Sequence, residues 1–279
     1  EFAKIAIIIY LAHSLSKKNI NFIKQFYIGV LPHLVFTGII ILLILRQPDF
    51  GTSAIIGMVL FIMMIVAGVK WRDIIMIFAV LISAAYLLVI TAPYRVERFK
   101  AFLNPWEHRQ TSGYQLIESL FAFGSGKVSG VGLGNSFQKR FYLPEAHTDF
   151  IGAIIGEELG LIGTISLIIL FVLFFYVGIR IAQKAQTLFG VYVALGISIL
   201  IFVQAVVNFA VILGALPTKG LTLPFISFGG SSIVSTLIMM GILFNISKQQ
   251  SENELPLVNY VTDNEYTRKK TNPKKVIKQ

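Results

Sequence analysis

Seven long apolar stretches, separated by polar connections, dominate the chain. Crossing the hydrocarbon core of a bilayer, which is about 30 Å thick, takes roughly 20 residues of helix. We therefore predict seven membrane-spanning helices, at about 2–16, 29–46, 51–69, 73–92, 152–179, 188–213 and 224–247. Within a bilayer, backbone groups must find their partners inside the protein, which favours helices for stretches of this length. The predicted fold class is an all-α, polytopic integral membrane helix bundle.

Positive charge is concentrated in alternate connections between these stretches. Simple alternation of the helices places those connections on one side, and an excess of Lys and Arg in short loops is typical of the cytoplasmic side. The segment 93–151 and the connections around 46–50 and 216–227 then face outward. Segment 93–151 is also basic, but at nearly 60 residues its charge no longer decides its side. The cytoplasmic positive charges are Lys17, Lys18, Lys24, Lys70, Arg72, Arg180, Lys184 and the tail from Lys248.

The composition agrees with a membrane protein, because 55% of the residues are hydrophobic, 14% are charged and the mean hydropathy is +0.75. The net charge of +10 lies in short loops and a tail instead of on one soluble face, so we expect no nucleic-acid partner. The chain has no cysteine, which excludes disulfides and thiolate chemistry. Its four histidines are scattered and predict no metal cluster.

The sequence leads to a prediction for each end of the chain. The sequence starts at Glu1 without a methionine and enters an apolar stretch almost at once, which indicates an N-terminally truncated first span. The tail 248–279 is polar and basic, and we expect it to be a disordered cytoplasmic tail that touches anionic headgroups. The predicted organisation is a membrane domain at 1–247 followed by this tail.

A cluster of glycines at positions 124, 126, 130, 132 and 134 invites a phosphate-loop interpretation. The spacing excludes it, because Phe121 stands where a phosphate-loop motif ending at Lys127 needs its first glycine. A dinucleotide motif fails as well, since Ser129 stands where the third glycine belongs. A mobile loop that contacts substrate and a turn-rich connector stay equally open.

The boundary between the long loop and the fifth stretch gathers acidic residues around Asp149. An ionisable group at the mouth of a membrane span is expensive unless it faces water, a cavity or a partner charge, which favours a functional role. The alternative is that Thr148 or Asp149 caps the helix. Glu157 and Glu158 lie one or two turns further on, where capping is no longer available, and we expect them to support the structure by pairing with Lys or Arg from another helix.

Three glycines recur every four residues in the same region, at Gly152, Gly156 and Gly160. On a helix they would form one smooth stripe, which is typical of close packing between membrane helices.

Two other outer connections carry isolated charges. Lys219 lies in a connection punctuated by proline and glycine, and Arg46 and Asp49 lie in another. Such a cation either snorkels to the membrane interface or binds an anionic headgroup opposite the carboxylate of Asp149.

Five motifs together resemble the SEDS family of bacterial shape, elongation, division and sporulation proteins. They are QPDFGT at 47–52, GLGNS at 132–136, YLPEAHTDFI at 142–151, GEELG at 156–160 and GLTLPFISFGGSS at 220–232. The residues of these motifs are more similar to those of the division and sporulation members than to those of the elongation members. Phe228 replaces the usual tyrosine, and the residue at the position of Lys219 varies within the family. The resemblance covers 1–247 and implies ten transmembrane helices, of which the first three or so are missing here.

The resemblance also implies an activity: polymerisation of lipid II into β-1,4 glycan strands on the outer face of the bacterial cytoplasmic membrane, during division and at the septum. Asp149 matches the essential aspartate of the family and is the expected general base, with undecaprenyl pyrophosphate as the leaving group. A divalent cation, Mg²⁺ or Mn²⁺, is a possible cofactor, with Asp149 as one conceivable ligand. The substrate-contacting candidates are Arg46, Lys127, Lys139, Arg140, Glu145, His147, Lys219 and Ser231; the structural candidates are Asp49, Gly152, Gly156, Glu157, Glu158 and Gly160.

Partners and alternatives follow from the same resemblance. The expected partners are lipid II, a cognate class B penicillin-binding protein and membrane proteins of the division machinery. A lipid II flippase is the alternative function, but it would need ionisable groups along a path through the bilayer, and few lie inside the seven stretches. A scaffolding protein that does not bind lipid II is a third hypothesis.

Overall fold

The computed structural model describes residues 1–254, and within that range it contains helices and no strand. The all-α prediction is confirmed. The α-helices are α1 (Phe2–Ser16), α2 (Ile20–Ile23), α3 (Leu31–Leu45), α4 (Phe50–Val66), α5 (Trp71–Ile90), α6 (Pro93–Leu103), α7 (Tyr114–Gly126), α8 (Ile151–Lys184), α9 (Leu188–Ile212) and α10 (Gly230–Glu254). Two short π-helices, η1 (Phe26–Val30) and η3 (Gln138–Tyr142), and one 3-10 helix, η2 (Pro105–His108), complete the described elements.

Each of the seven apolar stretches coincides with a helix. Five are long and apolar enough to cross a membrane, namely 26–45, α5, α8, α9 and the first 20 residues of α10; α1 and α4 are shorter apolar helices. The last helix begins at Gly230 and not at 224, because residues 224–226 form a turn and 227–229 are not helical. α10 continues through residues 248–254 of the predicted tail, and the remainder, 255–279, lies outside the described residues.

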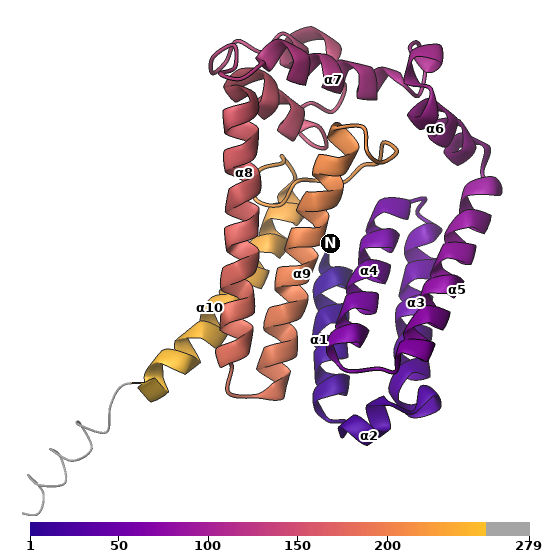
Figure 1. Cartoon of the computed structure of the whole chain (residues 1–279), viewed down its shortest axis with the longest axis vertical. Coiled ribbons are helices and arrows are strands. Elements are labelled where there is room, and N and C mark those ends of the chain that lie inside the picture. The colour runs from indigo at the N-terminus through magenta and orange to yellow at the C-terminus, as the bar shows by residue number, and fades with distance from the viewer. Residues whose placement is uncertain (255–279) are drawn as a thin grey trace, which may run out of the picture.

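α9 is the central helix of the bundle (Figure 1). It contacts α1 and α4 on one side and α8 and α10 on the other. Two thirds of its apolar window is buried, compared with about a fifth of the windows in α3, α5 and α8. This burial makes α9 the element against which the connecting segments can be fixed.

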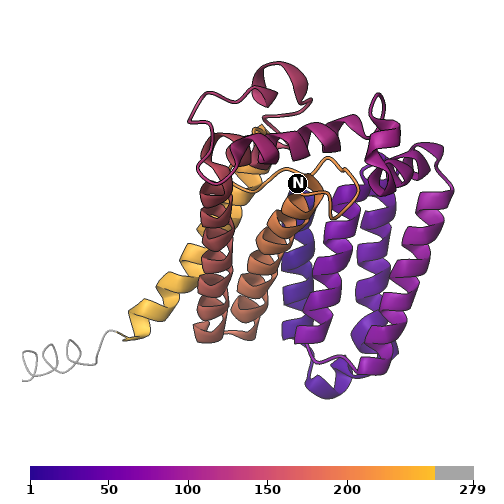
Figure 2. The ribbon, with the colours of Figure 1, turned by 45° about the horizontal axis from the view of Figure 1, so that its top comes forward.

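The connections predicted to face outward lie together at one end of the bundle. α6 and α7 cross that end, above the turn between α3 and α4 and above the segment that follows α9 (Figures 1 and 2). The long loop expected at 93–151 therefore contains helices. α7 buries Leu116, Ile117 and Ala122, and the hydroxyl of Ser119 donates to the Ile212 carbonyl at 2.7 Å. These contacts attach the segment to the end of α9.

α8 is broken at Gly160, where φ is 66° and ψ is −161°. Such a break leaves backbone amides and carbonyls without their helical partners, and these must be satisfied elsewhere. The loop after α7 supplies the partners on both sides of the break. The four bonds are Val131 N to Glu157 O (3.0 Å), Gly132 N to Glu158 O (3.0 Å), Leu161 N to Lys127 O (2.9 Å) and Ile162 N to Val128 O (3.2 Å).

The glycine cluster makes this docking possible. A Cβ atom on Gly126 would overlap the Gly156 carbonyl, and one on Gly130 would overlap the Glu158 carbonyl. The glycine cluster was predicted to be either a mobile loop that contacts substrate or a turn-rich connector. The close packing at Gly126 and Gly130 matches a connector packed on α8. Gly152 and Gly156 pack against side chains of α9 and α7, as the predicted glycine stripe requires. Gly160 does not continue the stripe, because the helix is broken at this residue.

Glu157 ties the same loop to α8. Its carboxylate is buried and accepts hydrogen bonds from the Ser136 hydroxyl, the backbone amides of Phe137 and Gln138 (3.2 and 3.3 Å) and the Ser125 hydroxyl (3.3 Å). These partners replace the Lys or Arg that the sequence led us to expect. Glu158 is half-buried, and its Oε1 is buried without a hydrogen-bond partner.

Candidate functional site

Asp149 lies immediately before α8, at the end of the bundle crossed by α6 and α7. The N-cap of α8 is Phe150, and no side chain caps that helix, so Asp149 does not have the capping role that was its alternative. Its carboxylate faces Gly220, since its Oδ2 atom lies 3.2 Å from the position a Cβ on Gly220 would take. The carboxylate is thus directed at the loop that joins α9 to α10.

Burial raises the pKa of the Asp149 carboxyl from 3.8 to about 6. This value includes smaller contributions from the negative charges of Glu145 and Asp49, which raise the pKa, and from the positive charge of Arg98, which lowers it. A carboxylate in this range is mostly ionised at neutral pH and still basic enough to accept a proton. Perturbed carboxylates of this kind are typical of catalytic sites.

Lys219 stands on the loop that Asp149 faces. Its ammonium lies over the ring of Phe50, 4.1 Å from the ring centroid, and the guanidinium of Arg95 lies 5.8 Å from the same centroid. Burial lowers the pKa of the Lys219 ammonium from 10.5 to about 8. Arg98 reaches the loop as well, through a 3.4 Å hydrogen bond from its guanidinium to the Thr218 carbonyl. Lys219 on the loop and Arg98 bound to it therefore bring positive charge to this end of the bundle, and the charge of Arg98 acts on the Asp149 carboxyl.

The segment 147–149 is fastened to the 213–229 loop at several points. The hydroxyl of Ser227 donates to the Thr148 carbonyl, and the Phe228 amide donates to the His147 carbonyl at 2.9 Å. The side-chain amide of Asn208, from α9, donates to the Asp149 carbonyl. These bonds hold the two segments together, and the residues that Ser227 and Phe228 join to the loop lie about 80 positions away in the chain.

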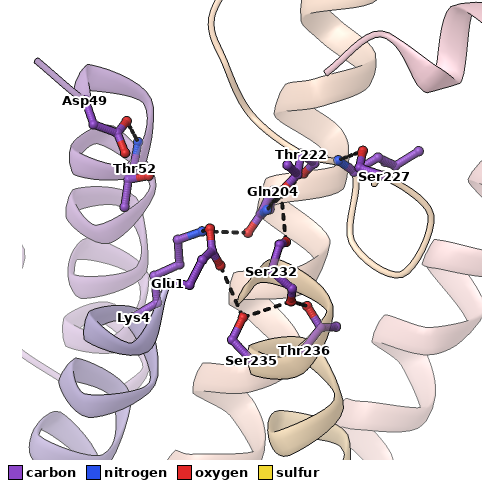
Figure 3. A network of polar contacts seen from close by, with 11 residues as sticks. Glu1, Lys4, Asp49, Thr52, Gln204, Thr222, Ser227, Ser232, Ser235 and Thr236 are labelled. Atoms are coloured by element: carbon purple, nitrogen blue, oxygen red, sulfur yellow. Dashed lines mark hydrogen bonds and ion pairs between the residues drawn. The ribbon is translucent and has the colours of Figure 1, made fainter. Parts of the chain in front are cut away.

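A polar network continues from this loop into the bundle (Figure 3). The Gln204 side chain donates to the Thr222 carbonyl at 2.9 Å, and the Thr222 hydroxyl pairs with that of Ser232 at 3.0 Å. On the opposite side, Gln204 accepts from the ammonium of Lys4 at 3.4 Å, and Lys4 forms an ion pair with Glu1 at 2.8 Å. The network connects α1, α9, the loop and α10.

Of the other predicted site residues, some lie near Asp149 and the rest have no bond to it among the described residues. Glu145 and His147 lie on the Asp149 segment, and the Glu145 carboxylate accepts from Thr148 at 2.8 Å. Asp49 caps α4, because its carboxylate accepts from the Thr52 amide at 2.9 Å. In the part of the chain that the structure describes, no hydrogen bond or ion pair connects Asp149 to the remaining candidates. These are Arg46 at the end of α3, Lys127, Lys139 and Arg140 in the segment docked on α8, and Ser231 in the first turn of α10.

Sequence reasoning missed five residues that build this site, namely Phe50, Arg95, Arg98, Gln204 and Asn208. A signal for two of them was present. Gln204 and Asn208 are amides four residues apart in an otherwise apolar helix, where a buried polar group is expensive unless it is hydrogen-bonded. Phe50 lies within the QPDFGT motif, but no role was assigned to it there, and nothing in the sequence pattern marks Arg95 or Arg98.

Among residues 1–254 no group of three or more His, Cys, Asp and Glu side chains is arranged to hold a metal ion. Near Asp149, the carboxylates of Asp49 and Glu145 are engaged by Thr52 and Thr148.

The long apolar helices and this polar site at one end of their bundle define a multi-pass membrane protein. A family model for cell cycle proteins of the FtsW, RodA and SpoVE type matches residues 1–252. The chain belongs to that family, and the resemblance to the SEDS family is confirmed.

Individual relatives and solved structures agree with this family assignment. A probable peptidoglycan glycosyltransferase FtsW from Geobacter sulfurreducens is 48% identical over 247 residues, which cover 88% of this chain and 66% of that protein. Stage V sporulation protein E from Bacillus subtilis is 44% identical over 248 residues, covering 89% and 68%. The chain spans just under two thirds of the length of the Geobacter relative.

Two structural neighbours share the fold. A chain from a structure described as "Structural coordination of polymerization and crosslinking by a peptidoglycan synthase complex" matches with a TM-score of 0.69 and 28% identity, covering 89% of this chain and 69% of that one. The rod shape determining protein RodA of Thermus thermophilus matches with a TM-score of 0.60 and 26% identity, covering 89% and 64%.

Proposed function

We propose that the protein is a peptidoglycan glycosyltransferase that polymerises lipid II into β-1,4 glycan strands, with Asp149 as the general base. The observation that carries this proposal is the half-buried Asp149 carboxylate, with its raised pKa, facing a loop that bears the cation Lys219. The relatives named as peptidoglycan glycosyltransferases support it.

The chemistry requires a base and a stabilised leaving group. The 4-hydroxyl of one sugar attacks the anomeric carbon of another, and the new C–O bond forms as the bond to undecaprenyl pyrophosphate breaks. Asp149 accepts the hydroxyl proton during attack, which contributes about 10²- to 10⁴-fold to the rate. The electron pair of the breaking bond leaves with the pyrophosphate, so cations can stabilise it without a second acid.

Lys219, Arg95 and Arg98 are the cations that this site offers for the leaving group. Beside them, an apolar groove of about 600 Å³ begins at Phe50 and continues between α3, α4 and α5, with Gly57 and Leu216 in its lining. A polyprenyl tail suits such a groove, because its apolar surface leaves the lipid phase at little cost. Phe50 thus separates a cationic region from an apolar one, as a lipid-linked pyrophosphate requires.

A divalent cation, Mg²⁺ or Mn²⁺, would assist by neutralising charge on the pyrophosphate. Mg²⁺ is commonly held by one or two carboxylates together with substrate phosphates, and Asp149 is the carboxylate here that can contribute.

We propose further that this end of the bundle faces the outside of the bacterial cytoplasmic membrane, at the division septum, with the C-terminal tail in the cytoplasm. The Lys-rich connections at the opposite end support this orientation. We also propose that a class B penicillin-binding protein and membrane proteins of the division machinery are its partners, in line with the neighbour from a peptidoglycan synthase complex.

The test is polymerisation of labelled lipid II by the purified full-length protein, with and without the penicillin-binding partner. Asp149→Asn and Asp149→Ala should abolish polymer formation while the proteins keep the elution profile and melting temperature of a folded membrane protein. Glu107→Gln removes an exposed carboxylate from the same segment and serves as the matched control. Normal polymerisation by the Asp149 variants would refute the base assignment.

The flippase alternative gains some support from the buried network of Lys4, Gln204 and Thr222, which places polar groups inside the bundle (Figure 3). Liposomes that contain the Asp149→Asn variant separate the two functions. Translocation of lipid II that persists without polymerisation would favour transport.

A further inference from the structure

Asn208 makes two hydrogen bonds that join distant parts of the site. Its side chain is 2% exposed, on the face of α9 toward the loop. The Nδ2 atom donates to the Asp149 carbonyl at 2.8 Å and to the Leu221 carbonyl at 2.6 Å. One amide group with two N–H donors therefore spans the proposed base segment and the loop that carries the cation.

These two bonds act close to the reacting groups. Leu221 follows Gly220, whose α-carbon faces the Asp149 carboxylate, and Gly220 follows Lys219. The other bonds between the two segments lie further along the loop, at Ser227 and Phe228. Gln204, one turn earlier in α9, holds Thr222 but does not contact residue 149. In the described part of the chain, Asn208 is the side chain that binds both 149 and 221.

Asparagine is not the most stabilising residue that a membrane helix could carry at position 208. The Oδ1 atom of Asn208 is buried without a hydrogen-bond partner, and a buried polar atom left unpaired lowers the stability of the fold. An amide that carries such a cost and directs both of its donors at the two halves of a site indicates a geometric role.

We infer that Asn208 is a positioning residue, which fixes the Asp149 carboxylate against the Lys219 loop. This inference rests on the proposed glycosyltransferase function for its effect on rate, but its geometric part can be tested without activity.

The geometric test uses cysteines, since these 279 residues contain none. In the full-length protein, with any other cysteine replaced, Asp149→Cys and Gly220→Cys form a pair whose partners are adjacent. The Asp149 carboxyl carbon lies 4.0 Å from the Cβ position of residue 220, and Gly220 is not among the glycines with positive φ. Disulfide yield after mild oxidation is read by maleimide–polyethylene glycol labelling.

We expect the yield to fall severalfold when Asn208→Ala is added and to be retained with Gln204→Ala, which releases Thr222 and Lys4 but removes no hydrogen bond to residue 149 or 221. Ser198→Ala, another buried polar residue of α9 that bonds its own helix at Ala194, controls for a general loss of packing. An unchanged yield with Asn208→Ala, or an equal fall with Gln204→Ala, would overturn the inference.

The kinetic test compares wild type, Asn208→Ala and Ser198→Ala in lipid II polymerisation. Misplacement of a reacting group by about 1 Å can cost up to 10²-fold in rate, so we expect kcat to fall about 10- to 100-fold for Asn208→Ala with little change in KM. The acid limb of the pH profile should also move to lower pH, because Asp149 becomes more exposed while Glu145, Asp49 and Arg98 stay in place.

A structural defect alone would lower the amount of active protein without moving that limb. If Asn208→Ala does not fold, Asn208→Ser keeps one donor and gives the same comparison with a smaller effect. Unchanged kcat and an unmoved acid limb would contradict the positioning role. If wild type itself forms no polymer, the proposed function fails, and the disulfide yields still decide the geometric part.

Discussion

Replacing Asp149 by Asn should abolish polymerisation and, at the same time, make the protein more stable at neutral pH. Burial raises the pKa of this carboxyl from 3.8 to about 6, so the folded state disfavours the ionised form. Asparagine has the size of the protonated acid and carries no charge. The variant removes the cost of holding a charge in a half-buried position.

The sign and the pH window follow from proton linkage. Between pH 4 and 6 the folded state binds more protons at Asp149 than the unfolded state does, so stability falls as the pH rises through this range. Above about pH 7 both states are largely ionised and the cost is nearly constant. A rise in pKa from 3.8 to about 6 corresponds to about 3 kcal/mol at 1.36 kcal/mol per pKa unit. Because the group is partly exposed, solvent screening lowers this, and we expect about 1–2 kcal/mol.

The assay is thermal unfolding of the full-length protein in detergent at half-unit steps from pH 4.5 to pH 8. For a chain of this size, 1 kcal/mol corresponds to about 2–4 °C in melting temperature. The difference between Asp149→Asn and wild type should be small at pH 4.5, grow to about pH 7 and then stay nearly constant, whereas Glu107→Gln should show no such rise. A variant that is less stable than wild type at pH 8 would refute the reasoning, since it would mean that the ionised carboxylate stabilises the fold.

Three further predictions concern other parts of the structure. Polymerisation should show a bell-shaped pH profile, rising near pH 6 as Asp149 ionises and falling near pH 8 as Lys219 loses its proton; Lys219→Arg should remove the upper limb, and an unmoved limb would exclude Lys219 as its source. Gly160→Ala should lower the melting temperature by several degrees, because φ is 66° and the new methyl group meets the Val128 carbonyl at 2.5 Å; Gly241→Ala, with nothing within 4 Å, should have little effect, and equal melting temperatures would contradict the break in α8. Gly57→Leu should place a side chain in the apolar groove and raise KM severalfold for lipid II with a full-length tail but not for a short-tailed analogue, with Gly38→Leu as control; an equal effect on both substrates would argue against a tail in this groove.

The amino-acid sequence determined the fold class and singled out the candidate site residue Asp149. Stretches of apolar residues long enough to span a bilayer specify helices through local backbone pairing and contact with lipid, so their number and approximate limits can be predicted without tertiary information. The polar motif around Asp149 could also be located, because a carboxylate at the mouth of a span is costly and therefore conspicuous.

Only the tertiary structure decided which segments meet. Asn208 bonds Asp149 across 59 residues of sequence, and Glu157 bonds Ser136 across 21, and no local periodicity encodes such pairings. The spacing of Gly152, Gly156 and Gly160 predicts one smooth helix face, yet the chain breaks at Gly160 because the loop after α7 supplies hydrogen bonds on both sides of the break. Sequence periodicity indicates which faces of a segment lie in an apolar environment and which lie in a polar one. The position of the Asp149 carboxylate relative to the loop that carries Lys219 depends on individual long-range hydrogen bonds, which form only when the bundle has assembled.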